Sequence, residues 1–256
     1  MKGWKQYSML LLAAMLLAVM QPINAGAVYA PPAESVSNYV QTSVQVSDGK
    51  AAAVQAASAV KLNYKKKKLT VGKTFTLKLT GAKVKSFTSS DKKIASVSKK
   101  GVVTAKKAGT ATIKVKAKNG KTYQCKVTCR PSQSQAYKKI IAKKKKYPEG
   151  MKWTNDNYYA WKGGVYSAGY GCAAFAFLLS DAAFGTLPAK THENYDDIKA
   201  GDILRLYNDS HSVIVLKVSG DTVTLAEGNF NGKVHWGRTM TLDEVKENCT
   251  YVMTRY

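Results

Sequence analysis

Residues 109–118 alternate strictly between apolar and polar side chains, and this period of two constrains the fold more than any other feature of the chain. Such alternation is typical of a β-strand with one buried face. Residues 74–79 alternate in the same way, and glycines recur between residues 72 and 120 at roughly the spacing of turns between short strands. We therefore expect residues 59–129 to form a β-sandwich.

The same segment carries almost all of the chain's excess charge. Residues 61–130 hold 20 lysines and one arginine with Asp91 as the only acid, whereas the net charge of the whole chain is +24. Residues 151–256 have 12 acidic and 10 basic side chains. A single domain rarely divides its charge so sharply, so we expect two modules. Residues 130–150 would join them as a basic linker that contains a helix, followed by a Pro-Glu-Gly turn.

Two interpretations of the lysines stay open. Lysine on solvent-facing strands keeps a sheet soluble and blocks pairing at its edges. A strongly basic surface also attracts anionic polymers, and the binding is salt-sensitive. Aromatic residues are sparse here, so we do not expect specific recognition of nucleic acid.

The first residues have the features of a secretory signal. An apolar run covers Met9–Met20, after a short basic start. A membrane-spanning helix needs about 20 apolar residues, so the run fits a signal better than an uncleaved anchor. We expect a signal peptide over 1–27, cleaved after Ala27, then a linker over 28–58. No second apolar run follows, so we expect a secreted mature chain without a transmembrane segment.

Residues 59–129 resemble the bacterial immunoglobulin-like domain of group 2. The resemblance rests on Ser89–Val97, which reads SSDKKIASV, and on Gly101–Ile113, which reads GVVTAKKAGTATI. It implies an all-β immunoglobulin-like sandwich over 59–129 and a location on the bacterial surface. Cys125 and Cys129 fall on one predicted strand, about 13 Å apart, which is too far for a disulfide between them. We interpret them as small buried side chains.

A cysteine begins the most apolar segment of the second module. Cys172 follows Gly171 and precedes the run Ala173–Phe184, which is apolar on nearly all sides and predicts a buried helix. The free N–H groups at a helix start favour thiolate over thiol and can bind an oxyanion. A structural cysteine that faces the core is the alternative.

Short strands follow, and the second of them starts at a histidine. We expect strands over 203–207, 212–218, 222–227 and 233–239, so the buried helix would pack on an antiparallel sheet in an α+β module. His211 could be the base that takes the thiol proton, or a fixed core histidine. Glu227 and Asn229 end the next strand, where either could orient the imidazole. His192 and His235 compete for the role of base.

Residues 151–256 resemble the NlpC-type and CHAP-type enzymes of the papain-like superfamily. Trp161-Lys162-Gly163-Gly164 before Cys172, and Gly201-Asp202 before His211, are similar to NlpC motifs, whereas Glu227 and Asn229 are more similar to CHAP enzymes. The resemblance implies a cysteine hydrolase with Cys172 as nucleophile, His211 as base and Glu227 with Asn229 as orienting groups. Tyr170 and Trp161 would contribute to the oxyanion site or the cleft. The chain departs from the pattern at Gly171, Ala173 and Ala174, and at the inserted Lys162.

These features predict a secreted hydrolase that cuts an amide bond of peptidoglycan in a Gram-positive-type cell wall. The basic module would attach it to anionic wall polymers. We expect no cofactor and no metal site. The alternative is a surface adhesion or wall-binding protein whose enzyme-like module is inactive, and a transamidating cross-linker is a third interpretation.

Overall fold

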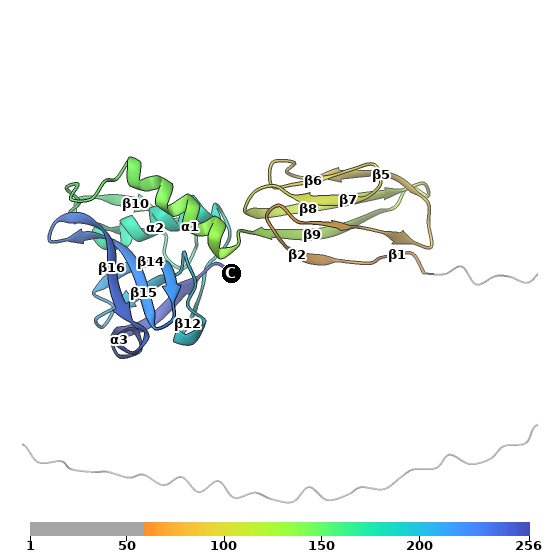
Figure 1. Ribbon diagram of the computed structural model, residues 1–256. Coiled ribbons are helices and arrows are strands. Elements are labelled where there is room, and N and C mark those ends of the chain that lie inside the picture. The colour runs from red at the N-terminus through yellow and green to blue at the C-terminus, as the bar shows by residue number, and fades with distance from the viewer. Residues whose placement is uncertain (1–58) are drawn as a thin grey trace, which may run out of the picture. The chain divides into compact units, whose positions relative to one another are not determined.

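The computed structural model describes residues 59–256, so the predicted signal peptide and the linker before residue 59 lie outside the described residues. Its first part consists of strands, with turns between them (Figure 1). The strands are β1 (Lys61–Leu62), β2 (Lys66–Thr70), β3 (Thr74–Thr76), β4 (Leu79–Thr80), β5 (Val84–Ser89), β6 (Ala95–Val97), β7 (Val102–Ala105), β8 (Gly109–Ala117) and β9 (Thr122–Arg130).

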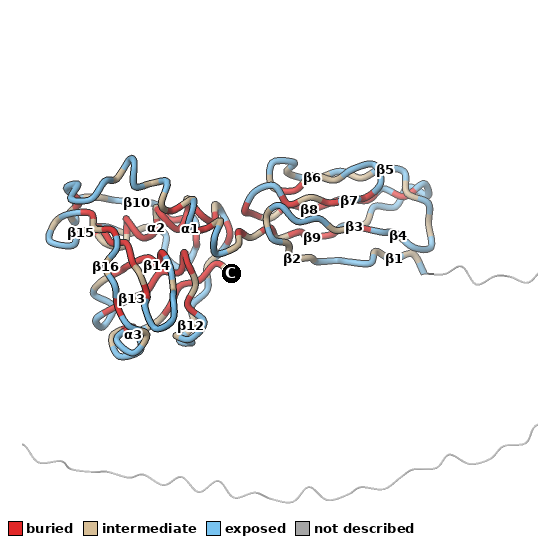
Figure 2. The backbone as a smooth tube through the Cα atoms, in the orientation of Figure 1, coloured by how far each residue is buried: buried red, intermediate tan, exposed pale blue. Residues whose placement is uncertain are grey.

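These strands form the predicted sandwich. A four-stranded sheet has the order β2-β9-β8-β5, a three-stranded sheet has the order β3-β7-β6, and β1 pairs with β4. The alternation along β8 decides which side chains enter the core, because Ile113 and Val115 are fully buried while Lys114 and Lys116 are exposed. Figure 2 shows buried stretches along β8 and β9. Cys125 and Cys129 are fully buried there as expected, and burial raises the pKa of Cys129 to about 11.

The second part is a mixed module. Its helices are α1 (Gln133–Ile141), the 3-10 helix η1 (Ala142–Lys145), α2 (Gly171–Phe184), the 3-10 helix η2 (Tyr195–Asp197) and α3 (Leu242–Asn248). Its strands are β10 (Tyr158–Ala160), β11 (Ala168–Tyr170), β12 (Lys190–His192), β13 (Ile203–Leu206), β14 (His211–Ser219), β15 (Thr222–Phe230), β16 (Lys233–Thr241) and β17 (Cys249–Thr254).

Six of these strands form one antiparallel sheet in the order β12-β17-β13-β14-β15-β16. Helix α2 packs on β14 and β15, with Phe175 and Leu179 fully buried in one core cluster together with Ile214 and Ala226. A second cluster on this sheet includes Leu204, Val213 and Val252. The expected arrangement of a buried helix on an antiparallel sheet is therefore present.

Two of the helices begin with side-chain caps. Thr241 and Glu244 form a reciprocal capping box at the start of α3, and Ser132 and Gln135 form one at the start of α1. Helix α1 belongs to the segment expected as a joining linker, yet its Ala136 and Ile140 are fully buried in the cluster that contains Phe184. This part of the basic segment therefore contributes to the core of the second module.

Candidate active site

Cys172 lies in the first turn of α2, directly after the N-terminal cap Tyr170 and Gly171. Backbone N–H groups at this end have no partner within the helix and make it electropositive. Burial of the thiol opposes its ionisation, but hydrogen bonds with His211 and the Ser212 backbone outweigh burial and lower the pKa of Cys172. Cys172 is therefore more easily ionised than an ordinary cysteine.

His211 connects the cysteine to a buried carboxylate. It is the first residue of β14, and Nε2 lies 2.8 Å from Oε2 of Glu227 on β15. Because Glu227 occupies Nε2, the other ring nitrogen, Nδ1, is left for the Cys172 thiol. Burial alone would lower the pKa of His211, but its contacts with Cys172 and Glu227 raise it to about 9. Thiolate and imidazolium therefore stabilise each other.

Glu227 is fully buried, so its negative charge needs partners. One oxygen contacts His211, and the other, Oε1, lies 2.9 Å from Nε of Arg238 on β16. Arg238 also donates from Nη1 to the Tyr207 hydroxyl at 3.3 Å. Nothing in the sequence around Arg238 identifies it as part of a site, because only the pairing of β15 with β16 places it beside Glu227.

Asn229 has a different partner from the one its position predicts. It lies in the same small pocket as His211 and Glu227, but its Nδ2 donates to Oδ1 of Asn155 at 2.8 Å. The backbone of Asn229 is left-handed, with a φ of 59°. Asn155 carries no signal in the sequence, and it reaches Asn229 over a separation of 74 residues.

The Asn155–Asn229 pair explains one departure from the resemblance. A Cβ atom added at Gly171 would lie 2.4 Å from Asn155 Oδ1 and 3.1 Å from Asn229 Nδ2. Gly171 also has a φ of 51°, which side chains disfavour. Glycine before Cys172 is therefore required here both by space and by backbone conformation.

The two residues expected near the oxyanion site or the cleft lie in different environments. Tyr170 is 61% exposed, with its ring 5.2 Å from that of Tyr158. Trp161 is only 6% exposed and stacks on Phe177 at 4.2 Å between ring centroids. This placement corrects the expectation for Trp161, because a side chain held in the core by apolar stacking does not line an open cleft.

The other two histidines have partners of their own. His235 Nδ1 lies 2.8 Å from Glu149 Oε1, and His192 Nδ1 accepts from the Asn194 backbone at 3.2 Å. His211 is the histidine that contacts Cys172, so the geometry favours it as the base.

Arg205 is a further charged neighbour that sequence reasoning missed. Its positive charge contributes to the lowered pKa of Cys172, after burial and the contacts with His211 and Ser212. The guanidinium contacts Asp209 and the Ser212 hydroxyl, and Nη2 donates to the Asp209 carbonyl at 2.6 Å. Tyr207, Asn208 and Asp209 all have positive φ, so the tight turn before His211 holds Asp209 against Arg205.

The structure brings a thiol, an imidazole and a buried carboxylate into contact. Among residues 59–256, no group of three His, Cys, Asp or Glu side chains is placed to hold a metal ion. No helix within that range is long and apolar enough to cross a membrane.

Comparisons with known proteins identify one part of the chain. Residues 42–127 match the bacterial Ig-like domain (group 2), which confirms the predicted immunoglobulin-like module; its first matched residues, 42–58, lie outside the described part. A search of curated proteins finds no match.

Among solved structures, Ly7917 is similar with a TM-score of 0.35 and 16% identity, over 48% of this chain and 62% of that one. Ly7917 with the hydrolyzing product of MDP has a TM-score of 0.32 and 14% identity, over 48% of this chain and 63% of that one. A mutant of intimin from EHEC O157:H7 has a TM-score of 0.25 and 14% identity, over 68% of this chain and 81% of that one. This chain thus spans less than two thirds of the length of Ly7917.

Proposed function

We propose that residues 131–256 form a papain-like cysteine hydrolase, similar to NlpC-type and CHAP-type enzymes, that cuts an amide bond in peptidoglycan. The observation that carries this proposal is the continuous contact from Cys172 through His211 to the buried Glu227. Each residue meets a requirement of acyl transfer: an activated thiol, a base and a group that orients the base.

The reaction would proceed in two steps. The Cys172 thiolate attacks the carbonyl carbon, and the amide bond breaks as the leaving amine takes a proton from His211. Water then attacks the thioester and gives a proton to His211, which releases the carboxylic acid and restores the Cys172 thiolate beside the imidazolium. Backbone N–H groups in the first turn of α2, with Cys172 N–H first among them, would receive the oxyanion.

The proposed location rests on the other module. The bacterial Ig-like domain and its lysines would hold a secreted enzyme at the anionic polymers of a Gram-positive-type wall. Lysine supplies point charges, so this attachment is expected to weaken as salt is raised.

The test is digestion of purified sacculi by the whole mature chain, read by mass spectrometry, with Cys172→Ala as the control. New termini that are absent with the variant support the hydrolase and identify the bond. If folded protein releases no product from walls of several types, the proposal fails in favour of a wall-binding protein with an inactive enzyme-like module. Products joined to an added amine would instead indicate a transamidase.

A further inference from the structure

One face of the four-stranded sheet presents an ordered array of lysines. Outward positions alternate with core positions along β2, β8 and β9, so that lysines share this face with threonines. We name it the lysine face and define it by Lys66, Lys68, Lys114, Lys116, Lys126, Thr112 and Thr128. Register places Lys66 beside Lys126, Lys68 beside Thr128, and Thr112 beside Lys126.

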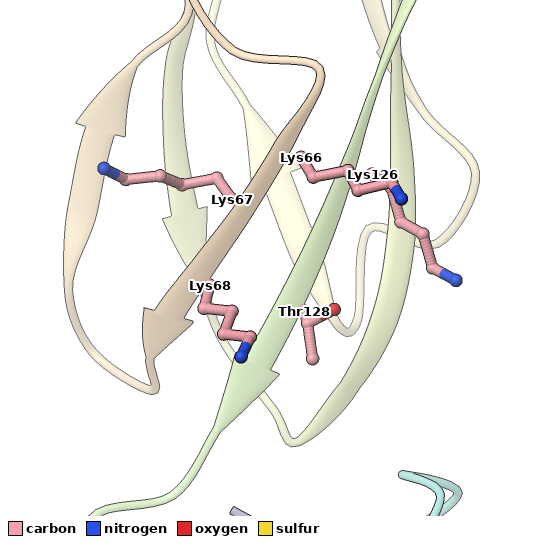
Figure 3. Close-up of a pocket in the computed structure, with 5 residues that line it drawn as sticks. All are labelled: Lys66, Lys67, Lys68, Lys126 and Thr128. Atoms are coloured by element: carbon pink, nitrogen blue, oxygen red, sulfur yellow. The ribbon is translucent and has the colours of Figure 1, made fainter.

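A cleft of about 340 Å³ lies where β2 meets β9, lined by Lys66, Lys67, Lys68, Lys126 and Thr128. In Figure 3 the side chain of Lys67 points away from those of Lys66, Lys68 and Lys126. Lys67 instead places its ammonium group 4.2 Å from the ring centroid of Tyr64. Strand alternation therefore decides which lysines belong to the lysine face: of the three consecutive lysines of β2, Lys66 and Lys68 belong to it and Lys67 does not.

The charges on this face are not compensated within the described residues. Every ion pair in residues 59–256 is formed by groups from Glu149 onward. The only acid of residues 61–130, Asp91, accepts from the backbone N–H groups of Lys93 and Ile94. Like charges directly opposite on neighbouring strands destabilise a sheet. A soluble sheet could carry its lysines without placing Lys66 opposite Lys126. An anion bound between the two ammonium groups would relieve their repulsion.

The composition of the face indicates which anion fits. Ammonium groups bind phosphate as point charges and, unlike the fork of arginine, impose no bidentate geometry, so they suit a polymer with repeated single charges. Threonine hydroxyls add donors between the charges. Phe75, Phe87 and Tyr123 pack against the core on the other side of these strands, and Tyr64 packs edge-on to Phe75. The lysine face thus offers no aromatic platform on which the bases of a single strand could stack.

We propose that the lysine face, centred on the Lys66–Lys68–Lys126–Thr128 cleft, binds a phosphodiester polymer without bases, of the polyol-phosphate kind. This inference rests on the proposed wall attachment and gives it a surface and a ligand class. It does not depend on catalysis by Cys172.

The experiment measures binding of the full mature chain to poly(glycerol phosphate) over a range of salt concentrations. All proteins carry Cys172→Ala so that hydrolysis cannot interfere. The test variant changes Lys66, Lys68 and Lys126 to Gln. The matched control changes Lys92, Lys99 and Lys100 to Gln, which removes the same charge from exposed turns outside the strands.

The test variant should bind at least about tenfold more weakly at low salt, and the control less than about twofold, if each lysine at an anionic surface contributes as usual. The slope of log affinity against log salt should fall by about 2 in the test variant, since about 0.7 is lost per phosphate contact. A third variant with Arg at the three positions should keep binding, and it shows that loss in the Gln variant reflects charge and not misfolding.

Three results would overturn the inference. Equal weakening by the two Gln variants would assign binding to overall charge. If single-stranded DNA bound as tightly as poly(glycerol phosphate) at the same phosphate concentration, the face would be assigned to nucleic acid. If polyglutamate bound as tightly, the face would have no preference for phosphate. Sacculus digestion reports separately on the proposed hydrolase: digestion without polymer binding rejects this inference alone, and binding without digestion rejects only the hydrolase.

Discussion

Arg238 and Glu227 form an ion pair behind the candidate catalytic histidine, with 2.9 Å between Nε and Oε1. Glu227 is fully buried and contacts His211 with its second oxygen. Arg238 is therefore placed to act on the cysteine only through Glu227, as a positioning residue.

This arrangement predicts a non-additive pair of substitutions. Arg238→Gln frees one side of Glu227, so the alkylation rate of Cys172 at pH 7 should fall by about tenfold, a coupling within the usual range for residues in contact. In a Glu227→Gln background the same change should have little further effect. A double-mutant cycle on iodoacetamide labelling rates measures this without a substrate. Equal effects of Arg238→Gln in both backgrounds would show that Arg238 does not work through Glu227.

The pH dependence of Cys172 provides a second prediction. His211 lowers the pKa of Cys172, so His211→Ala should raise that pKa and slow alkylation at pH 7 by about tenfold for each unit. Cys249 is the internal reference, because burial raises its pKa to about 11 and it should not label in folded protein. Labelling is followed by peptide mass spectrometry across pH. Unchanged labelling of Cys172 in the variant would contradict the contact.

The rate of hydrolysis should fall at alkaline pH, whereas the rate of Cys172 alkylation should not. The leaving amine needs a proton from imidazolium, and the pKa of His211 is raised to about 9. Above this pH the ring loses its proton while Cys172 remains thiolate, so turnover should fall and alkylation should not. Turnover on sacculi and alkylation are compared from pH 6 to pH 10. A fall of both rates together at high pH would argue against His211 as the proton donor.

Gly171 allows a test of the space before the cysteine. Gly171→Ala adds a methyl group 2.4 Å from Asn155 Oδ1 in a left-handed residue, whereas Gly164→Ala, at a φ of 85°, meets no atom within 4 Å. The control should cost about 1–2 kcal/mol of unfolding free energy from conformation alone. Gly171→Ala should cost more and should also slow labelling of Cys172, because the Asn155–Asn229 pair must shift. Urea unfolding and alkylation report the two effects; equal behaviour of the two variants would reject the steric argument.

The residues that sequence analysis identified share a property that the missed ones lack. Cys172, His211 and Glu227 belong to elements with clear local patterns, a largely apolar helix and two strands of a hairpin. Arg238 depends on the register of β15 with β16, which shifts between Leu225 and Ala226 and again after Glu227. A one-residue shift turns side chains to the other face of a sheet, so local alternation cannot place Arg238.

The fold, like the site, was predictable from the sequence where local patterns determine it and not where it depends on long-range pairing. Hairpin strands β13 to β16 pair with neighbours in sequence, and their patterns predicted them. Strand β17 follows α3 directly and inserts between β12 and β13, far away in the chain. Nothing in its own residues specifies that long-range pairing. Asn155 was missed for the same reason, since only the tertiary fold brings it to Asn229.

Another buried charge of the second module lies away from the candidate site. Arg255 is 1% exposed and donates from Nη1 to Asp181 Oδ1 at 2.6 Å. It also donates to the carbonyls of Leu187 and Gly185, each at 2.6 Å. Arg255 therefore joins the last residues of the chain to the end of α2, and its guanidinium satisfies backbone groups that burial would otherwise leave unpaired.

Arg255→Met should lower the free energy of unfolding by about 3–5 kcal/mol, because it leaves Asp181 buried without its cation. Lys246→Met is the control: it removes an exposed ion pair with Asp196 and should cost less than about 1 kcal/mol. Trp153, Trp161 and Trp236 all lie in this module, so tryptophan fluorescence in urea follows its unfolding in the mature chain. Adding Asp181→Asn to Arg255→Met should recover part of the loss, since the buried charge is then removed. Equal unfolding midpoints for the two single variants would show that the buried pair contributes no more than the exposed one.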